Sequence, residues 1–423
     1  MALKIGVIDF VTARKLPGEE KVQGASLHAN VSHAFRVGSG QLDTTLDHIP
    51  ADTLFSGLCH AWADLYGSEE ENGGLRQFLK AFPRLLLEPE PRMEKEDGVV
   101  GPPLRLSSAF PILVNRDLSR SHPSFFYPSP ASPLPGSLMD NPHHHVFLKH
   151  GRKHGRALKD LPYVSPEQCR IWLDWNGRRS ERDLRDFYTD IEKVHRPVEN
   201  RLTSKAQIAL SSTRETEVFS VASVHSLGAP TLLMPQGYPA PFYRRALLEG
   251  YKTRVQYAFW AELDDAWWKT AGGEEILTRV MSRLAVRGIG GKRSTAMGTF
   301  SFRWLDARDM PSPRLRPSAS STEAGWHYLL GPMYPTYAMQ CSPQWSQGFY
   351  NLANKGGWSE GGVRRMGLRF VEAGSLVWMD SECGYLVDVT PPGWGGSHPI
   401  YRFSAPLSLA LGPTLPGNAV APL

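Results

Sequence analysis

In each half of the chain, an apolar strand-like segment is followed by an amphipathic helix and then by further strand-like segments. In the first half, we expect a strand at residues 3–10 and a helix at 49–67. In the second half, we expect a strand at 253–263, a helix at 273–288 and a strand at 297–304. Apolar residues three and four positions apart are typical of a helix that buries one face; here they are Leu54, Leu58, Trp62 and Leu65, then Ile276, Leu277, Val280, Met281 and Leu284.

This order of elements predicts an α+β fold with two ferredoxin-like βαββαβ domains, the arrangement shared by RNA-binding modules. We expect an N-terminal domain at residues 1–215, with a loop-rich insertion at about 88–165 that is rich in proline and serine. A C-terminal domain is expected at 216–408. Residues 409–423 have too few apolar side chains to pack and are expected to form a flexible tail.

The ends of the first helix are marked in the sequence. Asp52 is expected to cap its N-terminus, and Gly67 is expected to end it. In the second helix, the acidic Glu274 and Glu275 stand at the start and arginines follow, as the helix dipole favours.

The composition excludes several classes of protein. The four cysteines lie far apart and form no CxxC pair, so we expect reduced thiols and no structural zinc site. The first residues are expected to form a strand and not a signal peptide, and no apolar run approaches the length that spans a bilayer. We therefore expect a cytoplasmic protein with no membrane partner. A net charge of +5 indicates a polyanionic partner only if the charge is clustered.

The charge is clustered around the segment GIGGKRSTAMGTF, the glycine-rich loop (Gly288–Phe300). Between residues 276 and 305 there are six basic residues and no acidic one. Glycines can adopt positive φ, and consecutive backbone N–H groups in such a loop can bind an anion. We predict that a phosphate lies against Gly288, Gly290, Gly291, Lys292, Arg293, Ser294 and Thr295.

The loop matches neither of two well-known nucleotide-binding motifs. A dinucleotide fingerprint would need glycine at position 293, and a P-loop would need Ser or Thr there, but that residue is Arg293. The loop also follows a helix and opens a strand, the reverse of a P-loop. The ligand that remains compatible with the loop is the phosphate backbone of a polymer. The alternative is that the loop binds nothing and is a glycine-capped helix end with solvated charges. No cofactor is expected.

Several segments together resemble a known family, the RAMP proteins of CRISPR systems, and most closely the fourth subunit of type III-A Csm effector complexes. They extend over roughly residues 1–405 and comprise IPADTLFSGL (49–58), LRLSSAFPIL (104–113), FFYPSP (125–130), LKDLPYVS (158–165), RPVENRLT (196–203), the glycine-rich loop, EAGSLV (372–377) and HPIYRF (398–403). The long insertion, the HHH run at 143–145 and GGWSEGG at 356–362 depart from the family pattern.

The resemblance implies a non-catalytic RNA-binding subunit in antiviral defence. Such a subunit holds the 5′ repeat-derived handle of the guide RNA, docks the large polymerase-like Cas subunit and borders the backbone RAMP subunit of the same complex. A thumb-like hairpin of the family would have to lie within residues 88–142. The target RNA would be cut by the neighbouring backbone subunit and not by this one.

Further basic and histidine residues are candidates for RNA contacts. Arg196 and Arg201 either hold the RNA backbone or form surface salt bridges with Glu192 or Glu199. The basic run from Lys149 to Lys159 either crosses an RNA or solvates a loop. His33 could touch a base, although a core or surface histidine is the commoner role.

The alternative function is that of a RAMP endoribonuclease acting on guide precursor or target RNA. It would use Asp43 or Asp47 with a metal, or a histidine. We expect neither catalytic residues nor a metal site, because no paired base or metal-ligand set accompanies these aspartates, and three consecutive histidines diverge in direction.

Overall fold

The computed structural model describes a little over half of the sequence in detail. The described residues are 2–10, 33–35, 48–69, 73–87, 91–96, 99, 101–115, 123–139, 141, 143–152, 162–173, 180–195, 222–224, 253–270, 274–290, 298–305, 317, 324–357, 364–379, 384–396 and 398–413. They form an α+β fold with several antiparallel sheets.

The largest sheet is built around two strands that lie far apart in the sequence. Strand β1 (Ala2–Asp9) pairs antiparallel with β11 (Thr253–Leu263), so that Ile5 lies opposite Trp260. The sheet order is β12-β1-β11-β6-β7, and β5 (Leu104–Leu106) also pairs with β11. The remaining strands are β12 (Ser301–Trp304), β6 (Phe110–Asn115) and β7 (Ser124–Phe125).

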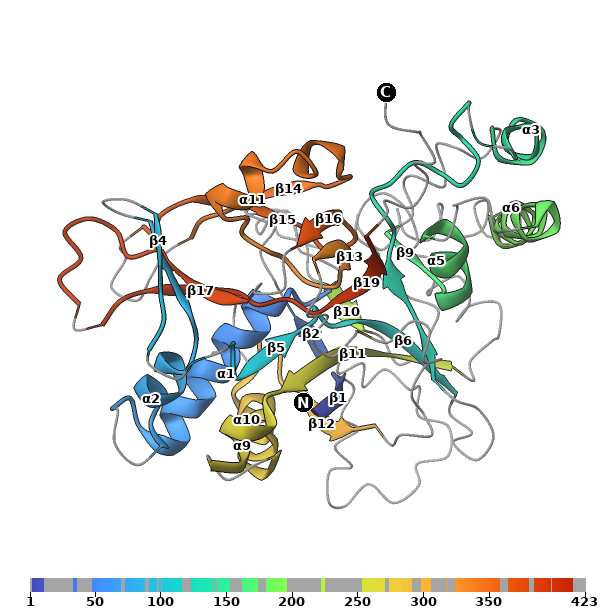
Figure 1. The fold of residues 1–423 in the computed structure, drawn as a ribbon. Helices are drawn as coiled ribbons and strands as arrows, with labels where there is room; N and C mark the ends of the chain where they lie inside the picture. The colour runs from blue at the N-terminus through green and yellow to red at the C-terminus, as the bar shows by residue number, and fades with distance from the viewer. Residues whose placement is uncertain are drawn as a thin grey trace, which may run out of the picture.

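Two helices complete this unit. Helix α1 (Ala51–Tyr66) follows β1 in the chain, and α10 (Glu274–Arg287) follows β11. The two helices pack together, with Leu284 of α10 against Gly57 of α1. The main elements therefore run β1, α1, β6, β11, α10, β12, with antiparallel neighbours in the order β12-β1-β11-β6, which is one ferredoxin-like unit. Figure 1 shows its strands together near the centre of the molecule.

This topology bears on the expected domain boundaries. Strand β6 lies inside the expected insertion at 88–165, and it pairs with β11 over six residue pairs. In the sequence, the expected boundary between residues 215 and 216 lies after β6 and before β11, and these two strands are neighbours in one sheet. Helix α10 and the start of the glycine-rich loop belong to this same unit.

Helix α1 forms at the predicted place, but Asp52 does not cap it. The N-cap residue is Pro50, without a side-chain cap, and Asp52 is already in the first helical turn. Gly67 ends the helix with φ of 80°, as expected. Leu54, Leu58 and Trp62 are buried, whereas Leu65 is 43% exposed, since it lies in the last turn of the helix.

An aromatic cluster fills the space beside α1. Trp62 stacks on Phe78 of α2 (Leu75–Lys80) with ring centroids 4.4 Å apart. Phe55 stacks on Phe403 of β18 (Tyr401–Ser404) at the same distance. Helix α9 (Asp265–Thr270) adds Trp268, which donates a hydrogen bond to the carbonyl of Pro103. The core of the ferredoxin-like unit is therefore continuous with that of the C-terminal segments.

The C-terminal part of the chain, drawn in orange and red in Figure 1, forms smaller sheets, one of which also includes β3 and β4 from the N-terminal part, drawn in blue. One has the order β16-β13-β19, another pairs β14 with β15, and a third has the order β18-β17-β3-β4. The bounds are β3 Arg84–Leu86, β4 Arg92–Glu94, β13 Gly325–Leu329, α11 Tyr337–Cys341, η8 Trp345–Gln347, β14 Leu352–Lys355, β15 Leu368–Val371, β16 Leu376–Met379, β17 Tyr385–Asp388 and β19 Ser408–Gly412.

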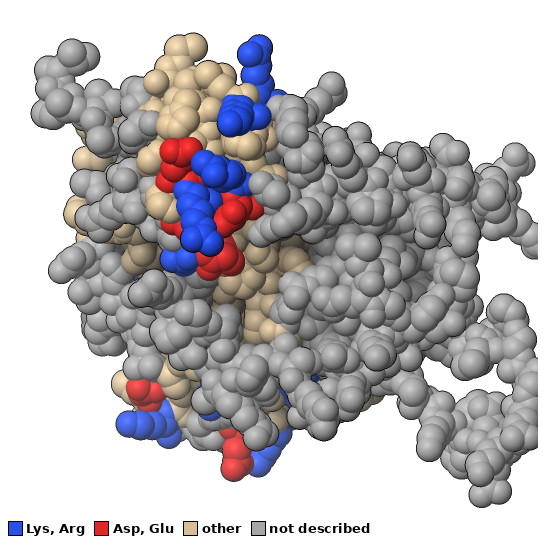
Figure 2. Space-filling model, turned by 90° about the vertical axis from the view of Figure 1, so that its right-hand side faces the viewer, with Lys and Arg blue, Asp and Glu red and all other residues tan. Residues whose placement is uncertain are grey.

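Another group of elements lies on the right in Figure 1. It comprises the strand pair β8–β9 and four helical segments, with bounds β8 Tyr127–Pro128, α3 His144–Val146, the π-helical turn η2 Phe147–Gly151, β9 Tyr163–Val164, α5 Pro166–Leu173 and α6 Glu181–His195. Figure 2 views this side and shows acidic and basic side chains next to one another. Arg185, for example, pairs with Glu181 at 2.8 Å, so the described part of this face is not a continuous basic surface.

Three of the four cysteines, Cys59, Cys169 and Cys341, lie in the described part and are free thiols. Within the described residues, no helix is long and apolar enough to cross a membrane.

Candidate nucleic-acid interface

The glycine-rich loop emerges from a closed neck at the end of α10. Gly288 has φ of 81° and donates its N–H to Leu284, which ends the helix, and Gly290 has φ of 88°. Across the neck, Ile289 N–H bonds to the carbonyl of Gly298 at 3.0 Å. A Cβ on Gly298 would lie 2.0 Å from the Ile289 oxygen, so only glycine fits. The neck holds both ends of the loop together.

Of the predicted loop residues, Gly288 and Gly290 are described. Gly291, Lys292, Arg293, Ser294 and Thr295 lie outside the described residues, as do Arg196 and Arg201. His33 lies on β2 (His33–Phe35), opposite Val224 of β10 (Ala222–Val224), and its side chain is not described. The predicted phosphate contacts therefore stay predictions.

The charge count around the loop overstates the free positive charge. Arg279 bonds to Glu275 one turn earlier at 3.2 Å. Arg283 and Arg287 both contact Asp64 of α1, at 3.1 and 2.6 Å. These hydrogen bonds, that of Arg287 foremost, hold the pKa of Asp64 below its ordinary value. Of the six basic residues counted in the sequence, three are thus already paired, two of them through a partner more than 200 positions away.

A cavity of about 700 Å³, which we call the α1 pocket, adjoins the neck. It lies between helices α1 and α2 and the segment 394–403, which ends in β18. Its lining includes Arg287, Arg365 and Arg402 with Asp52 and Asp64. Three arginines against two aspartates leave one net positive charge. Arg287, which directly precedes Gly288, lies where the neck and this pocket meet.

Asp52 is the buried centre of the charges in the α1 pocket. Its side chain is 8% exposed and accepts hydrogen bonds from Lys355 at 2.9 Å and from Arg402 at 3.3 Å. Burial would raise the pKa of Asp52, but the charges and hydrogen bonds of Lys355 and Arg402 outweigh it and lower the pKa. Asp52 thus links α1 to β14 through Lys355 and to β18 through Arg402. The position of Asp52 near the start of a helix did not predict this role.

Two of the three consecutive histidines have side-chain partners. His144 Nδ1 lies 3.0 Å from the carbonyl of Gly136, and His145 lies 3.6 Å from Glu181. No group of three or more His, Cys, Asp or Glu side chains that could hold a metal occurs among the described residues. Asp43 and Asp47 lie outside that part of the chain.

The geometry defines an α+β protein in which a glycine-rich loop follows the second helix of a ferredoxin-like unit. Residues 322–411 match the family model of the CRISPR Csm4 C-terminal domain. The match confirms the resemblance to a Csm4-like RAMP subunit of a type III-A CRISPR effector, which the sequence had indicated. The matched region begins before β13 and ends within β19, and it includes Lys355 and Arg402.

Two solved structures align with nearly the whole chain at low identity. A chain of the Csm3-Csm4 subcomplex in the type III-A CRISPR-Cas interference complex is 13% identical, with 97% of this chain and 100% of that chain covered and a TM-score of 0.42. A chain of the Csm1-Csm4 cassette in complex with pppApA is also 13% identical, with 98% and 99% covered and a TM-score of 0.39. A comparison with curated proteins finds no match. The match to the family model is therefore confined to residues 322–411.

Proposed function

We propose that this chain is a non-catalytic RNA-binding subunit of a type III-A CRISPR surveillance complex. It holds the 5′ repeat-derived handle of the guide RNA, docks the large polymerase-like Cas subunit and borders the backbone RAMP subunit. The observation that carries the proposal is the match of residues 322–411 to the Csm4 C-terminal domain. The closed neck of the glycine-rich loop supports it, because the hydrogen bond between Ile289 and Gly298 holds the two ends of the segment that carries Lys292 and Arg293.

The proposed partners follow the solved complexes, in which Csm4 is found with Csm1 and with Csm3. We propose that the large and backbone subunits correspond to these two proteins.

A second, reduced ferredoxin-like unit belongs to the same proposal. In the sheet β16-β13-β19, the first strand in sequence, β13, lies between the other two, as in the order 3-1-4 of that fold. Helix α11 follows β13, as the first helix would. The hairpin β17–β18 stands between β16 and β19, where the second helix would be.

The loop contacts can be tested by salt dependence. We expect Lys292→Ala and Arg293→Ala each to reduce the slope of log affinity against log salt by about 0.7 for a single-stranded handle RNA, because each removes one phosphate contact. Fluorescence anisotropy between low and moderate salt measures the slope. Arg279→Ala removes the same charge from a residue that is paired with Glu275, and it should leave the slope unchanged. An unchanged slope for both loop variants would take the loop out of the interface.

The absence of catalysis is a separate prediction. We expect the purified chain to leave repeat RNA and target RNA intact in the presence of Mg²⁺ or Mn²⁺, measured on a denaturing gel. Specific cutting that is abolished by Asp43→Ala or Asp47→Ala would instead favour the endoribonuclease.

A further inference from the structure

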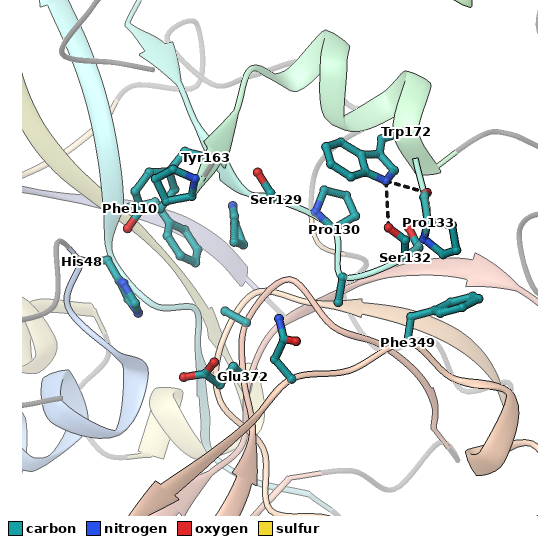
Figure 3. Close-up of a pocket in the computed structure, with 15 residues that line it drawn as sticks. His48, Phe110, Ser129, Pro130, Ser132, Pro133, Tyr163, Trp172, Phe349 and Glu372 are labelled. Carbon is teal, nitrogen blue, oxygen red and sulfur yellow. Dashed lines mark hydrogen bonds between the residues drawn. The ribbon is translucent and has the colours of Figure 1, made fainter. Parts of the chain in front are cut away.

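A second cavity, of about 550 Å³, is formed by segments far apart in the sequence; we call it the proline pocket. Its rim combines residues 128–133, which begin in β8, with Tyr163 of β9 and Phe110 of β6. The C-terminal part contributes Phe349, Asn351, Glu372 and Ala373. Figure 3 shows these side chains around one space. The volume lies within the range of small-ligand sites.

The segment 128–133 is held in place by hydrogen bonds. Trp172 Nε1 donates to the carbonyls of Ser132 and Pro133, at 3.3 and 3.0 Å (dashed lines in Figure 3). Ser129 N–H bonds to the carbonyl of Pro162, and Ala131 N–H bonds to that of Gly374, at 3.0 and 2.9 Å. With φ of 90°, Gly374 allows this approach, since its Cβ would lie 2.6 Å from the Ser129 oxygen. The pocket is therefore preformed.

Flat rings line one side of the proline pocket. The ring of His48 lies 5.9 Å from that of Phe110 at an interplanar angle of 32°, and Tyr163 meets Phe110 edge-on at 6.2 Å. Phe349, half-buried, lies on the opposite rim in Figure 3. Such rings offer stacking surfaces for a flat aromatic guest.

The polar groups of the pocket would be left unpaired by a purely apolar guest. Two hydroxyls of the wall, those of Ser129 and Ser132, have no hydrogen-bond partner within the described structure, but they are fully buried and offer no surface to a guest. Glu372, half-buried, and Asn351 add a carboxylate and an amide to the same lining. The described lining contains no Lys or Arg, so a phosphate has no cation there. A neutral ring with hydrogen-bond donors on its edge fits this chemistry.

We propose that the proline pocket receives one unstacked nucleobase that carries an exocyclic amino group. The base stacks on the aromatic rim, and its amino group donates a hydrogen bond to the Glu372 carboxylate, as cytosine N4 does with acidic side chains elsewhere. Uracil has an oxygen in place of that amino group, and the carboxylate repels it. The inference rests on the proposed function, since the base would belong to the same bound RNA.

The test compares cytosine with uracil, two rings of similar size that differ at position 4. Fluorescence anisotropy with the full-length chain measures the affinities of fluorescein-labelled C8 and U8 RNA at one fixed salt concentration. We expect C8 to bind about tenfold tighter than U8, and Glu372→Gln to bring the ratio close to one, because an amide can donate to uracil as well. Phe349→Ala should weaken both RNAs by a similar factor, about tenfold.

Controls separate the possible failures. Glu69→Gln, an exposed glutamate just beyond α1 that pairs with Arg76, should leave both affinities unchanged. Equal binding of C8 and U8 to the wild type, or a ratio that Glu372→Gln does not change, overturns the pocket assignment, while salt-dependent RNA binding through Lys292 still upholds the proposed function. If neither C8 nor U8 binds, both the pocket assignment and the proposed RNA-binding function are refuted. If Glu372→Gln leaves the ratio intact and instead weakens binding of the purified large subunit, the pocket holds a protein side chain.

Discussion

Asp52→Asn is expected to lower the free energy of unfolding by about 3–5 kcal/mol. The substitution keeps the shape of the side chain but removes the only carboxylate that contacts both Lys355 and Arg402 in the described structure. Those two side chains are 15% and 11% exposed, so their charges would remain buried without compensation. Since they lie on β14 and β18, the loss would loosen the C-terminal sheets from α1. Urea unfolding of the full-length chain measures the change.

Helix α1 provides a matched control for this prediction. Asp64 also contacts two cations, Arg283 and Arg287, but its side chain is 23% exposed and the two arginines are 46% and 31% exposed. Solvent screens such pairs, so Asp64→Asn should cost no more than about 1 kcal/mol. Equal costs for Asp52→Asn and Asp64→Asn would contradict the buried role of Asp52. Adding Lys355→Met to Asp52→Asn should recover part of the loss, because it removes one of the stranded charges.

Stability is expected to fall in mild acid because of His327. This histidine on β13 is 6% exposed, and its Nδ1 lies 2.9 Å from the hydroxyl of Ser408 on β19. Burial, and then the charge of Arg105, lower the pKa of His327 from an ordinary value of 6.5 to about 4. Between these two values, the unfolded chain binds a proton that the folded chain does not. The free energy of unfolding therefore decreases as the pH falls from about 6.5 to about 4, by about 3 kcal/mol from this group.

The contribution of His327 can be isolated by subtraction. Unfolding curves of the wild type and of His327→Gln are measured at pH 7 and at pH 4.5. Other histidines titrate in both proteins, so the difference between the two pH dependences reports His327 alone. The variant should lose clearly less stability on acidification than the wild type. Parallel losses would show that His327 is protonated in the folded state without penalty.

The sequence predicted the elements whose patterns are local. Strand β11 was predicted at 253–263, where it occurs, and α10 within one residue at its start. Both are bounded by clear changes in apolar periodicity, and Gly288 marks the end of the helix. Strand β6 was missed because it lies in a stretch rich in proline, with Pro111 inside the strand itself. Its pairing with β11 depends on a partner about 140 positions away, which no local pattern reveals.

The candidate site was predicted unevenly for the same reason. Glycines at 288 and 290 were selected for positive φ, and both adopt it. The role of Asp52 could not be found, since Lys355 and Arg402 are some 300 positions distant and nothing near residue 52 marks them. The proline pocket was missed too, although four of the quoted segments that carried the family resemblance supply Phe110, Pro128, Tyr163 and Glu372 to it.

The pairing of β1 with β11 and β12 has a consequence for synthesis on the ribosome. Both of these neighbours begin after residue 252, so the first strand emerges long before either of them exists. At about 5–20 residues per second, roughly 12 to 50 seconds pass before β1 can form its first hydrogen bond with a neighbouring strand of this sheet. During that interval Ile5, Val7 and Ile8, all buried in the finished protein, face solvent or a chaperone. A chain that is released before residue 253 is synthesised would have an unpaired, apolar β1, and this strand would promote aggregation.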